Sequence, residues 1–70
     1  MSVRNCLKTL RRNKKLSQEE VARRAKLSLM GYIKIEKGMV TPKLDTAYRI
    51  AHAVGERLDI VFQFKEEKGK

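Results

Sequence analysis

The chain has 70 residues, of which 41% are hydrophobic and 36% are charged, and its formal net charge is +9. This length allows one domain and excludes a second core, and the composition is typical of a folded, helix-rich domain. No apolar run reaches the ~18 residues of a membrane span, and the N-terminal residues lack the hydrophobic stretch of a signal peptide. We therefore expect a cytoplasmic protein with no membrane association.

The positive charge is concentrated in the first part of the chain. Residues 1–43 contain twelve Lys or Arg against three Glu, whereas residues 44–70 contain five against five Asp or Glu. A one-sided basic surface is typical of a protein that binds a polyanion, and nucleic acid is the commonest polyanion in a cytosol. A merely solvated basic face is the alternative that charge alone leaves open.

The first predicted helix covers residues 4–13. Val3, Cys6, Leu7 and Leu10 recur at the spacing of one helix face, which places Cys6 on a buried stripe. Because Cys6 is the single cysteine, the sequence excludes an internal disulfide and a multi-cysteine zinc site.

Two further helices are predicted close together, over residues 18–25 and 29–37. Ser17 and Glu20 have the spacing of a capping box at the start of the first, and Ser28 is the expected N-cap of the second, which Gly38 closes. So short a connection between two amphipathic helices indicates a sharp crossing, which is the helix-turn-helix geometry.

Pro42 lies in a predicted loop, and a fourth helix is expected over residues 44–54, ended by Gly55. Its expected buried face contains five residues at helical spacing: Leu44, Ala47, Tyr48, Ala51 and Val54.

From residue 58 the hydrophobic period changes to two, with Leu58, Ile60, Phe62 and Phe64 on one side. This pattern predicts a β-strand over residues 58–65. A lone strand would leave its backbone groups unpaired, so we expect it to pair with the same strand of a second copy and form a dimer. A fifth short helix over residues 58–62 is the alternative. The charged segment 66–70 has no apolar anchor and is expected to be a disordered tail.

The expected fold class is therefore all-α. A four-helix domain of repressor-like helix-turn-helix type would occupy residues 1–57, and a C-terminal β-strand for dimerisation would occupy residues 58–65.

Several motifs together resemble the phage-repressor and Cro family of helix-turn-helix proteins, also called Xre-like. They are Leu16-Ser17-Gln18-Glu19-Glu20-Val21-Ala22, Leu27-Ser28, Ile35-Glu36-Lys37-Gly38, Pro42, Leu44-Asp45-Thr46 and Ile50-Ala51. The resemblance covers residues 4–55. It implies sequence-specific binding of double-stranded DNA.

The resemblance also implies roles for individual residues. Gln18 would bind a phosphate, and Lys37 and Lys43 would hold the DNA backbone. The residues facing the major groove would be Ser28, Leu29, Met30, Ile33 and Lys34. Arg11 would pair with Glu36, with direct phosphate contact by Arg11 as the alternative.

The sequence departs from the family pattern on the third helix, where members usually carry polar residues. Leu29, Met30 and Ile33 share one face with Lys34 and Lys37, so an exposed apolar patch is expected. Contact with thymine methyl groups, readout of DNA shape, binding of a protein and packing in the core all remain open as explanations. A second departure is Lys26, which stands in a turn where the family usually has glycine.

Enzymatic functions have little support, because the single histidine, His52, has no cysteine nearby and no metal-ligand or glycine-rich phosphate motif is present. We expect no cofactor and no metal. The function expected is that of a transcriptional repressor that binds an inverted-repeat operator as a homodimer. The alternative is an antitoxin, which binds a toxin protein and its own promoter.

Overall fold

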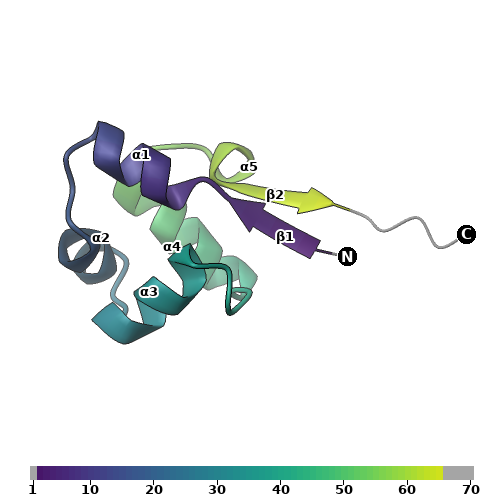
Figure 1. Ribbon diagram of the computed structural model, residues 1–70, viewed down its shortest axis with the longest axis horizontal. Helices are drawn as coiled ribbons and strands as arrows, with labels where there is room; N and C mark the ends of the chain where they lie inside the picture. The colour runs from purple at the N-terminus through teal and green to yellow at the C-terminus, as the bar shows by residue number, and fades with distance from the viewer. Residues whose placement is uncertain (1, 66–70) are drawn as a thin grey trace, which may run out of the picture.

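The structure is a computed structural model that describes residues 2–65 and the side chains of residues 4–63 (Figure 1). Its elements follow the order β1 (Ser2–Asn5), α1 (Leu7–Asn13), α2 (Gln18–Arg24), α3 (Leu29–Glu36), α4 (Leu44–Val54), α5 (Leu58–Val61) and β2 (Phe62–Lys65). The tail expected at residues 66–70 and the side chain of Phe64 lie outside the described residues. No helix in the described part is long and apolar enough to span a membrane.

The predicted helix-turn-helix is confirmed, with α2 and α3 packed against each other (Figure 1). Ser17 and Glu20 form the full capping box, because the Ser17 hydroxyl accepts from the Glu20 N–H and the Glu20 carboxylate accepts from the Ser17 N–H. Ser28 caps α3 by accepting from the N–H of Gly31 at 3.0 Å. The local signals therefore determine where both helices begin.

The N-terminus differs from the prediction, because residues 2–5 form a strand and α1 begins only at Leu7. Asn5 stabilises this boundary: its Oδ1 accepts from the Leu7 N–H at 3.1 Å, and its Nδ2 donates to the Ile35 carbonyl of α3 at 3.0 Å. Cys6 is half-buried rather than part of the core, and its thiol donates to the carbonyl of Ile60 at 3.1 Å.

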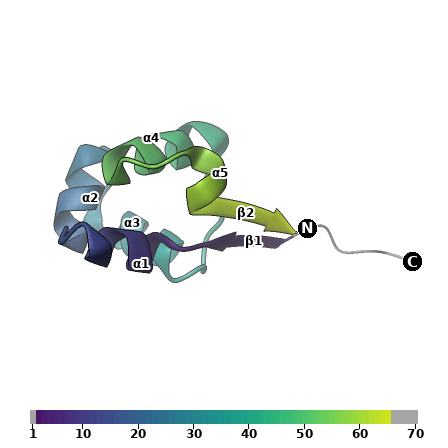
Figure 2. The ribbon, with the colours of Figure 1, turned by 90° about the horizontal axis from the view of Figure 1, so that it is seen from above.

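The β-strand predicted over residues 58–65 is wrong for residues 58–61, and the remaining strand pairs with a different partner from the one expected. Leu58–Val61 is a short helix, as the alternative held, and the strand covers only Phe62–Lys65. This strand pairs antiparallel with β1 of the same chain, with Asn5 opposite Phe62 and Ser2 opposite Lys65. The two strands lie side by side and project from the helices in both views (Figure 2). The prediction from the period of two failed because adjacent residues of a strand point to opposite faces, yet Val61 and Phe62 are both buried. The chain changes from helix to strand between these two residues, which allows both to face the core.

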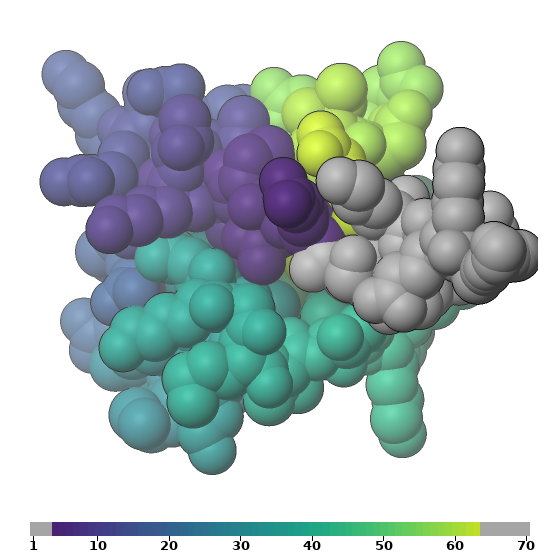
Figure 3. All heavy atoms as spheres, turned by 45° about the vertical axis from the view of Figure 1, so that its right-hand side comes forward, coloured from purple at the N-terminus to yellow at the C-terminus, as the bar shows by residue number. Residues whose placement is uncertain are grey.

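One hydrophobic core joins all five helices and the start of β2. Leu7, Val21, Tyr32, Ile50 and Phe62 are among its fully buried side chains. In the space-filling view the purple N-terminal residues lie against both the teal region of α3 and the yellow-green C-terminal residues (Figure 3). Leu7 of α1 and the adjacent Val61 and Phe62 of α5 and β2 thus belong to the same core as the helix-turn-helix.

The buried face of α4 is rotated from the one predicted. Ala47, Ile50, Ala51 and Val54 are buried, but Leu44 and Tyr48 are 70% and 67% exposed. The prediction failed because apolar residues outnumber the positions that can face the core on this helix, so pattern alone could not select the face.

Candidate nucleic-acid interface

Helix α3 presents one face to the core and the opposite face to solvent. Tyr32 and Ile35 are buried, whereas Met30 is 62% exposed and Leu29 is 38% exposed. Ile33 is half-buried on the outer side. The apolar patch expected from the sequence is therefore present on the free surface, and packing of Met30 in the core is wrong.

Two lysines extend the outer face of α3 toward its C-terminal end. Lys34 and Lys37 are both exposed, and Lys37 is the C-cap of the helix. Ser28 is exposed at the N-terminal end. Four of the five residues assigned to the groove are thus exposed and Ile33 is half-buried, and all five lie at the N-cap of α3 or along the helix.

The turn between α2 and α3 contains a strained residue. Lys26 has φ +60°, in the left-handed region that favours glycine. The carbonyl of Ala25, just before it, accepts from Arg49 Nε of α4 at 2.9 Å. This bond secures the end of α2 where the chain reverses, so α4 supports the geometry of the turn.

A polar cluster at the end of α3 holds that helix against α1 and α2. Glu36 accepts from Arg11 Nε at 2.9 Å and Nη2 at 3.2 Å, from the Tyr32 hydroxyl at 2.7 Å, and from Gln18 Nε2 at 3.1 Å. The side chains of Arg11 and Glu36 are only 12% and 5% exposed. The ion pair implied by the family resemblance is therefore present in this structure.

The cluster keeps Glu36 ionised. Burial acts to raise the pKa of its carboxyl, but the hydrogen bonds from Arg11, Tyr32 and Gln18 outweigh burial and hold the pKa below its ordinary value. Burial raises the pKa of the Tyr32 hydroxyl, and its bond to Glu36 adds to this effect. The hydrogen bond to Glu36 likewise raises the pKa of Arg11.

The other predicted DNA contacts lie outside α3. Gln18 begins α2, and its amide nitrogen is bonded to Glu36, which places it beside the end of α3. Lys43 is exposed at the N-cap of α4, separated from α3 by the loop that follows Gly38. Prediction from the sequence missed the engagement of Gln18 and Tyr32 with Glu36, although the spacing of four residues between Tyr32 and Glu36 was a usable signal.

A search for metal-binding chemistry among the described residues finds no group of three His, Cys, Asp or Glu side chains that could hold an ion. His52 is exposed on α4 and lines a surface pocket with Tyr48 and Leu58.

These features define a helix-turn-helix domain of the class that binds duplex DNA: a capped helix pair, a buried polar cluster behind α3, and an exposed α3 face with apolar residues followed by two lysines. The helix-turn-helix family model HTH_3 matches residues 7–61, well over half of the chain.

Relatives of nearly the same length support this result. A protein of Methanothermobacter thermautotrophicus named as an uncharacterized HTH-type transcriptional regulator is 35% identical over 69 residues, which cover 97% of this chain and 100% of the relative. HTH-type transcriptional regulators of Archaeoglobus fulgidus and Methanocaldococcus jannaschii are each 32% identical over 66 residues, covering 94% of this chain and 93% and 100% of the relatives.

The chain therefore belongs to the helix-turn-helix family of Cro and Xre type, as the sequence motifs indicated. It is a DNA-binding transcriptional regulator and not an enzyme.

Proposed function

We propose that this regulator is a repressor that binds an inverted-repeat operator as a homodimer, with α3 of each copy in the major groove. The observation that carries the proposal is the solvent-facing side of α3, which ends in Lys34 and Lys37 and belongs to the half of the chain that holds all of the net positive charge. A helix presented in this way fits the major groove, and its N-terminal residues reach the base edges.

The lysines divide between base and backbone contacts in this proposal. Lys34 lies closer to the start of α3 and reaches a base edge, whereas Lys37 and Lys43 bind phosphates. Gln18 also binds a phosphate. Its amide nitrogen carries two hydrogens, of which one is used by Glu36, and we assign the second to a phosphate oxygen.

A lone strand does not support the dimer, because β2 pairs with β1 of the same chain. Of the four residues first assigned to dimerisation, Phe62 is buried in its own core, Leu58 packs partly on that core, and Ile60 is 42% exposed. The support comes from what we call the α4–α5 face, which consists of Tyr48 and Leu58 at one pocket and of Leu44, one turn before Tyr48 on α4.

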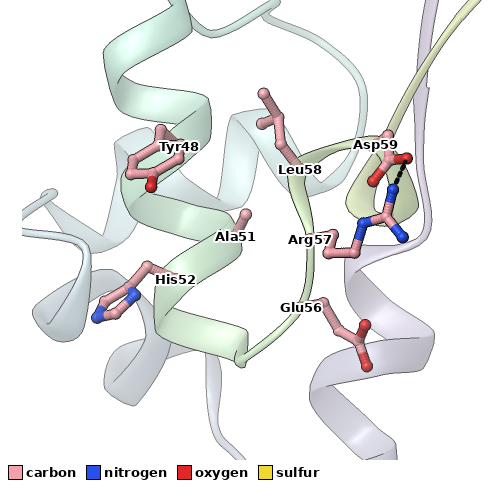
Figure 4. Close-up of a pocket in the computed structure, with 7 residues that line it drawn as sticks. All are labelled: Tyr48, Ala51, His52, Glu56, Arg57, Leu58 and Asp59. Atoms are coloured by element: carbon pink, nitrogen blue, oxygen red, sulfur yellow. Dashed lines mark hydrogen bonds and ion pairs between the residues drawn. The ribbon is translucent and has the colours of Figure 1, made fainter.

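The α4–α5 face fits a second copy of this chain. Tyr48 and Leu58 line one pocket from α4 and α5 (Figure 4). Residues 44–63 contain two Arg against three Asp or Glu, and ion pairs join Arg49 to Asp45 and Arg57 to Asp59. These two elements therefore carry nearly balanced charge, although Arg24 and Lys26 line a second pocket with Tyr48, and a second copy that covers the apolar residues removes exposed surface from water.

The dimer determines the expected form of the operator. A twofold axis relates the two α3 helices, so the half-sites are inverted and their centres lie about 10 bp apart or a multiple of that distance. Occupation of such a site within a promoter blocks polymerase, which is why we propose repression.

The antitoxin alternative would use the apolar side of α3 to bind a toxin protein. The relatives are named as HTH-type transcriptional regulators, and the exposed Lys34 and Lys37 add positive charge beside the apolar residues of α3. We therefore favour DNA as the occupant of α3.

Selection of bound duplexes from a randomised pool at ~150 mM salt, followed by sequencing, tests the proposal. We expect enrichment of an inverted repeat. Enrichment of a single half-site would refute binding as a dimer. Salt-sensitive binding without any enrichment would refute sequence-specific binding.

Two variants separate the roles of the lysines. Lys34→Ala should relax the preference at one base pair of each half-site. Lys37→Ala should weaken binding to all sequences alike and reduce the slope of log affinity against log salt by about one unit per copy. Titrations over a salt series with the selected operator and a scrambled duplex measure both effects, and identical behaviour of the two variants would contradict the assignment.

A further inference from the structure

The part of α3 that would face the bases, residues 28–34, has few side chains that can form hydrogen bonds. Between residues 28 and 34 the polar side chains are those of Ser28, Tyr32 and Lys34. The Tyr32 hydroxyl is buried against Glu36, and the Ser28 oxygen already accepts from the Gly31 N–H. This segment has no Arg, Asn or Gln, so it cannot form the two-bond contact that distinguishes adenine, and Lys34 is its one side chain able to form the two-bond contact with guanine.

Apolar side chains occupy the outer side of this segment instead. Met30 is at its centre and is 62% exposed, and Leu29 and Ile33 lie along its flank, one helical turn apart. Gly31 adds no side chain beside Met30, and a Cβ there would lie 2.9 Å from the Ser28 oxygen that caps the helix. The surface of α3 that would face the bases therefore presents mainly apolar side chains.

Only one feature of the major groove matches such a surface. Thymine carries a C5-methyl group there, whereas the other bases present hydrogen-bond donors and acceptors at the same edge. Covering those polar groups with hydrocarbon leaves them unpaired and is unfavourable, while covering a methyl group removes apolar surface from water. Both effects favour thymine opposite the apolar side chains.

We propose that Leu29, Met30 and Ile33 read thymine methyl groups, so that each half-site of the operator contains T·A pairs recognised through their methyls. This inference rests on the proposed DNA-binding function and names the chemistry by which α3 selects its site. Lys34, the next exposed residue along the helix, supplies the cationic contact beside the apolar cluster.

Deoxyuridine provides the test, because it differs from thymidine only by the missing C5-methyl. Duplexes carrying the selected operator are made with one thymidine of the half-site replaced at a time, and affinity is measured at ~150 mM salt. We expect each contacted methyl to account for about threefold to fivefold in affinity. Replacing that thymidine by deoxycytidine should also weaken binding, and 5-methyldeoxycytidine should recover part of the loss.

Variants connect each methyl to a side chain. Met30→Ala should weaken binding to the thymidine duplex and make binding indifferent to the methyl at one position, and Leu29→Ala should do so at another. Met39→Ala is the matched control, because Met39 is 68% exposed but lies in the loop after α3; it should keep the wild-type ratio of affinities for the two duplexes. Circular dichroism checks that the helices are retained.

The outcomes are distinguishable from those of the selection experiment. An enriched operator whose affinity is unchanged by every deoxyuridine substitution would overturn methyl reading and leave sequence-specific binding intact. The same holds if both α3 variants, Met30→Ala and Leu29→Ala, retain the wild-type methyl dependence. Failure to enrich any operator contradicts the proposed function itself, and with it this inference.

Discussion

At the scale of single residues, Glu36 has the largest structural role outside the apolar core. It accepts four hydrogen bonds from three helices while its own side chain is 5% exposed. A buried carboxylate with so many donors is stable only while all of them remain, because removing one partner exposes the remaining charge to a low-dielectric surrounding. The orientation of α3 therefore depends on a few polar contacts.

Replacing the cation of the cluster should strongly destabilise the domain. We expect Arg11→Ala to lower the free energy of unfolding by about 2 to 3 kcal/mol, because it leaves Glu36 buried without its ion pair. Urea denaturation measures the change. The control is Arg12→Ala, at an exposed position of the same helix, which should change stability by less than about 0.5 kcal/mol. Equal losses for both variants would show that the pair does not brace α3.

Acid should weaken the same contacts. The folded-state pKa of Glu36 lies below its ordinary value of 4.5, so the stabilisation by its carboxylate is complete above that pH and is lost as the pH falls through the lowered pKa. Glu36→Gln should cost about 2 kcal/mol at neutral pH and should lose less stability on acidification than the wild type.

Urea titrations between about pH 7 and pH 3 measure this difference. Glu19→Gln, at an exposed position of α2, should follow the wild-type curve. Glu20 adds to the acid sensitivity of both the wild type and the Glu36→Gln variant, because the hydrogen bond from the Ser17 N–H lowers the pKa of the Glu20 carboxyl. A Glu36→Gln curve parallel to that of the wild type would contradict the assigned role.

At the scale of the elements, the turn between α2 and α3 combines strain with precise positioning. Lys26 adopts a left-handed conformation that costs a side-chain-bearing residue roughly 1 kcal/mol. The strain is tolerated because Ser28 caps α3 directly afterwards and Arg49 bonds the carbonyl just before. The serine caps were predicted from the local sequence pattern, whereas the strained position was predicted from the family resemblance, because the family usually has glycine where this chain has Lys26.

Relieving this strain should stabilise the protein. We expect Lys26→Gly to raise the free energy of unfolding by about 0.5 to 1 kcal/mol, because glycine adopts the left-handed conformation without a Cβ clash and loses part of that gain to its greater freedom when unfolded. Thermal unfolding measures the change. Lys26→Ala removes the same charge but keeps the Cβ, so it should show no such gain; equal stability of the two variants would refute the strain.

At the scale of the whole molecule, the apolar surface is divided between two sides. One is the outer face of α3, and the other is the α4–α5 face, where Leu44 and Tyr48 are exposed. We assign DNA to the first because it belongs to residues 1–43, which hold the net positive charge, and a second copy to the other because residues 44–63 contain two Arg against three Asp or Glu.

Charge placed on the α4–α5 face should therefore separate the dimer. We expect Tyr48→Glu to weaken self-association by at least about tenfold, since a central aromatic residue typically contributes more than 1 kcal/mol to an interface. Because Tyr48 is exposed in the single chain, the variant should keep its fold. Sedimentation velocity without DNA measures the change, with Met30→Ala as a control that stays dimeric. A Tyr48→Glu dimer as tight as that of the wild type would refute this interface.

The sequence by itself determined the helix-turn-helix, its caps, the exposed apolar side of α3 and the family, because each depends on contacts within about one turn of helix or on a local motif. Only the tertiary structure decided the rest. Residues 2–5 became a strand because their partner lies some sixty residues along the chain, at Phe62–Lys65. Gln18 and Tyr32 converge on Glu36 only when α2 and α3 cross. On α4, Ala47 and Ala51 are buried whereas Leu44 and Tyr48 are exposed, because close packing and not hydrophobicity alone determines which side of the helix is buried.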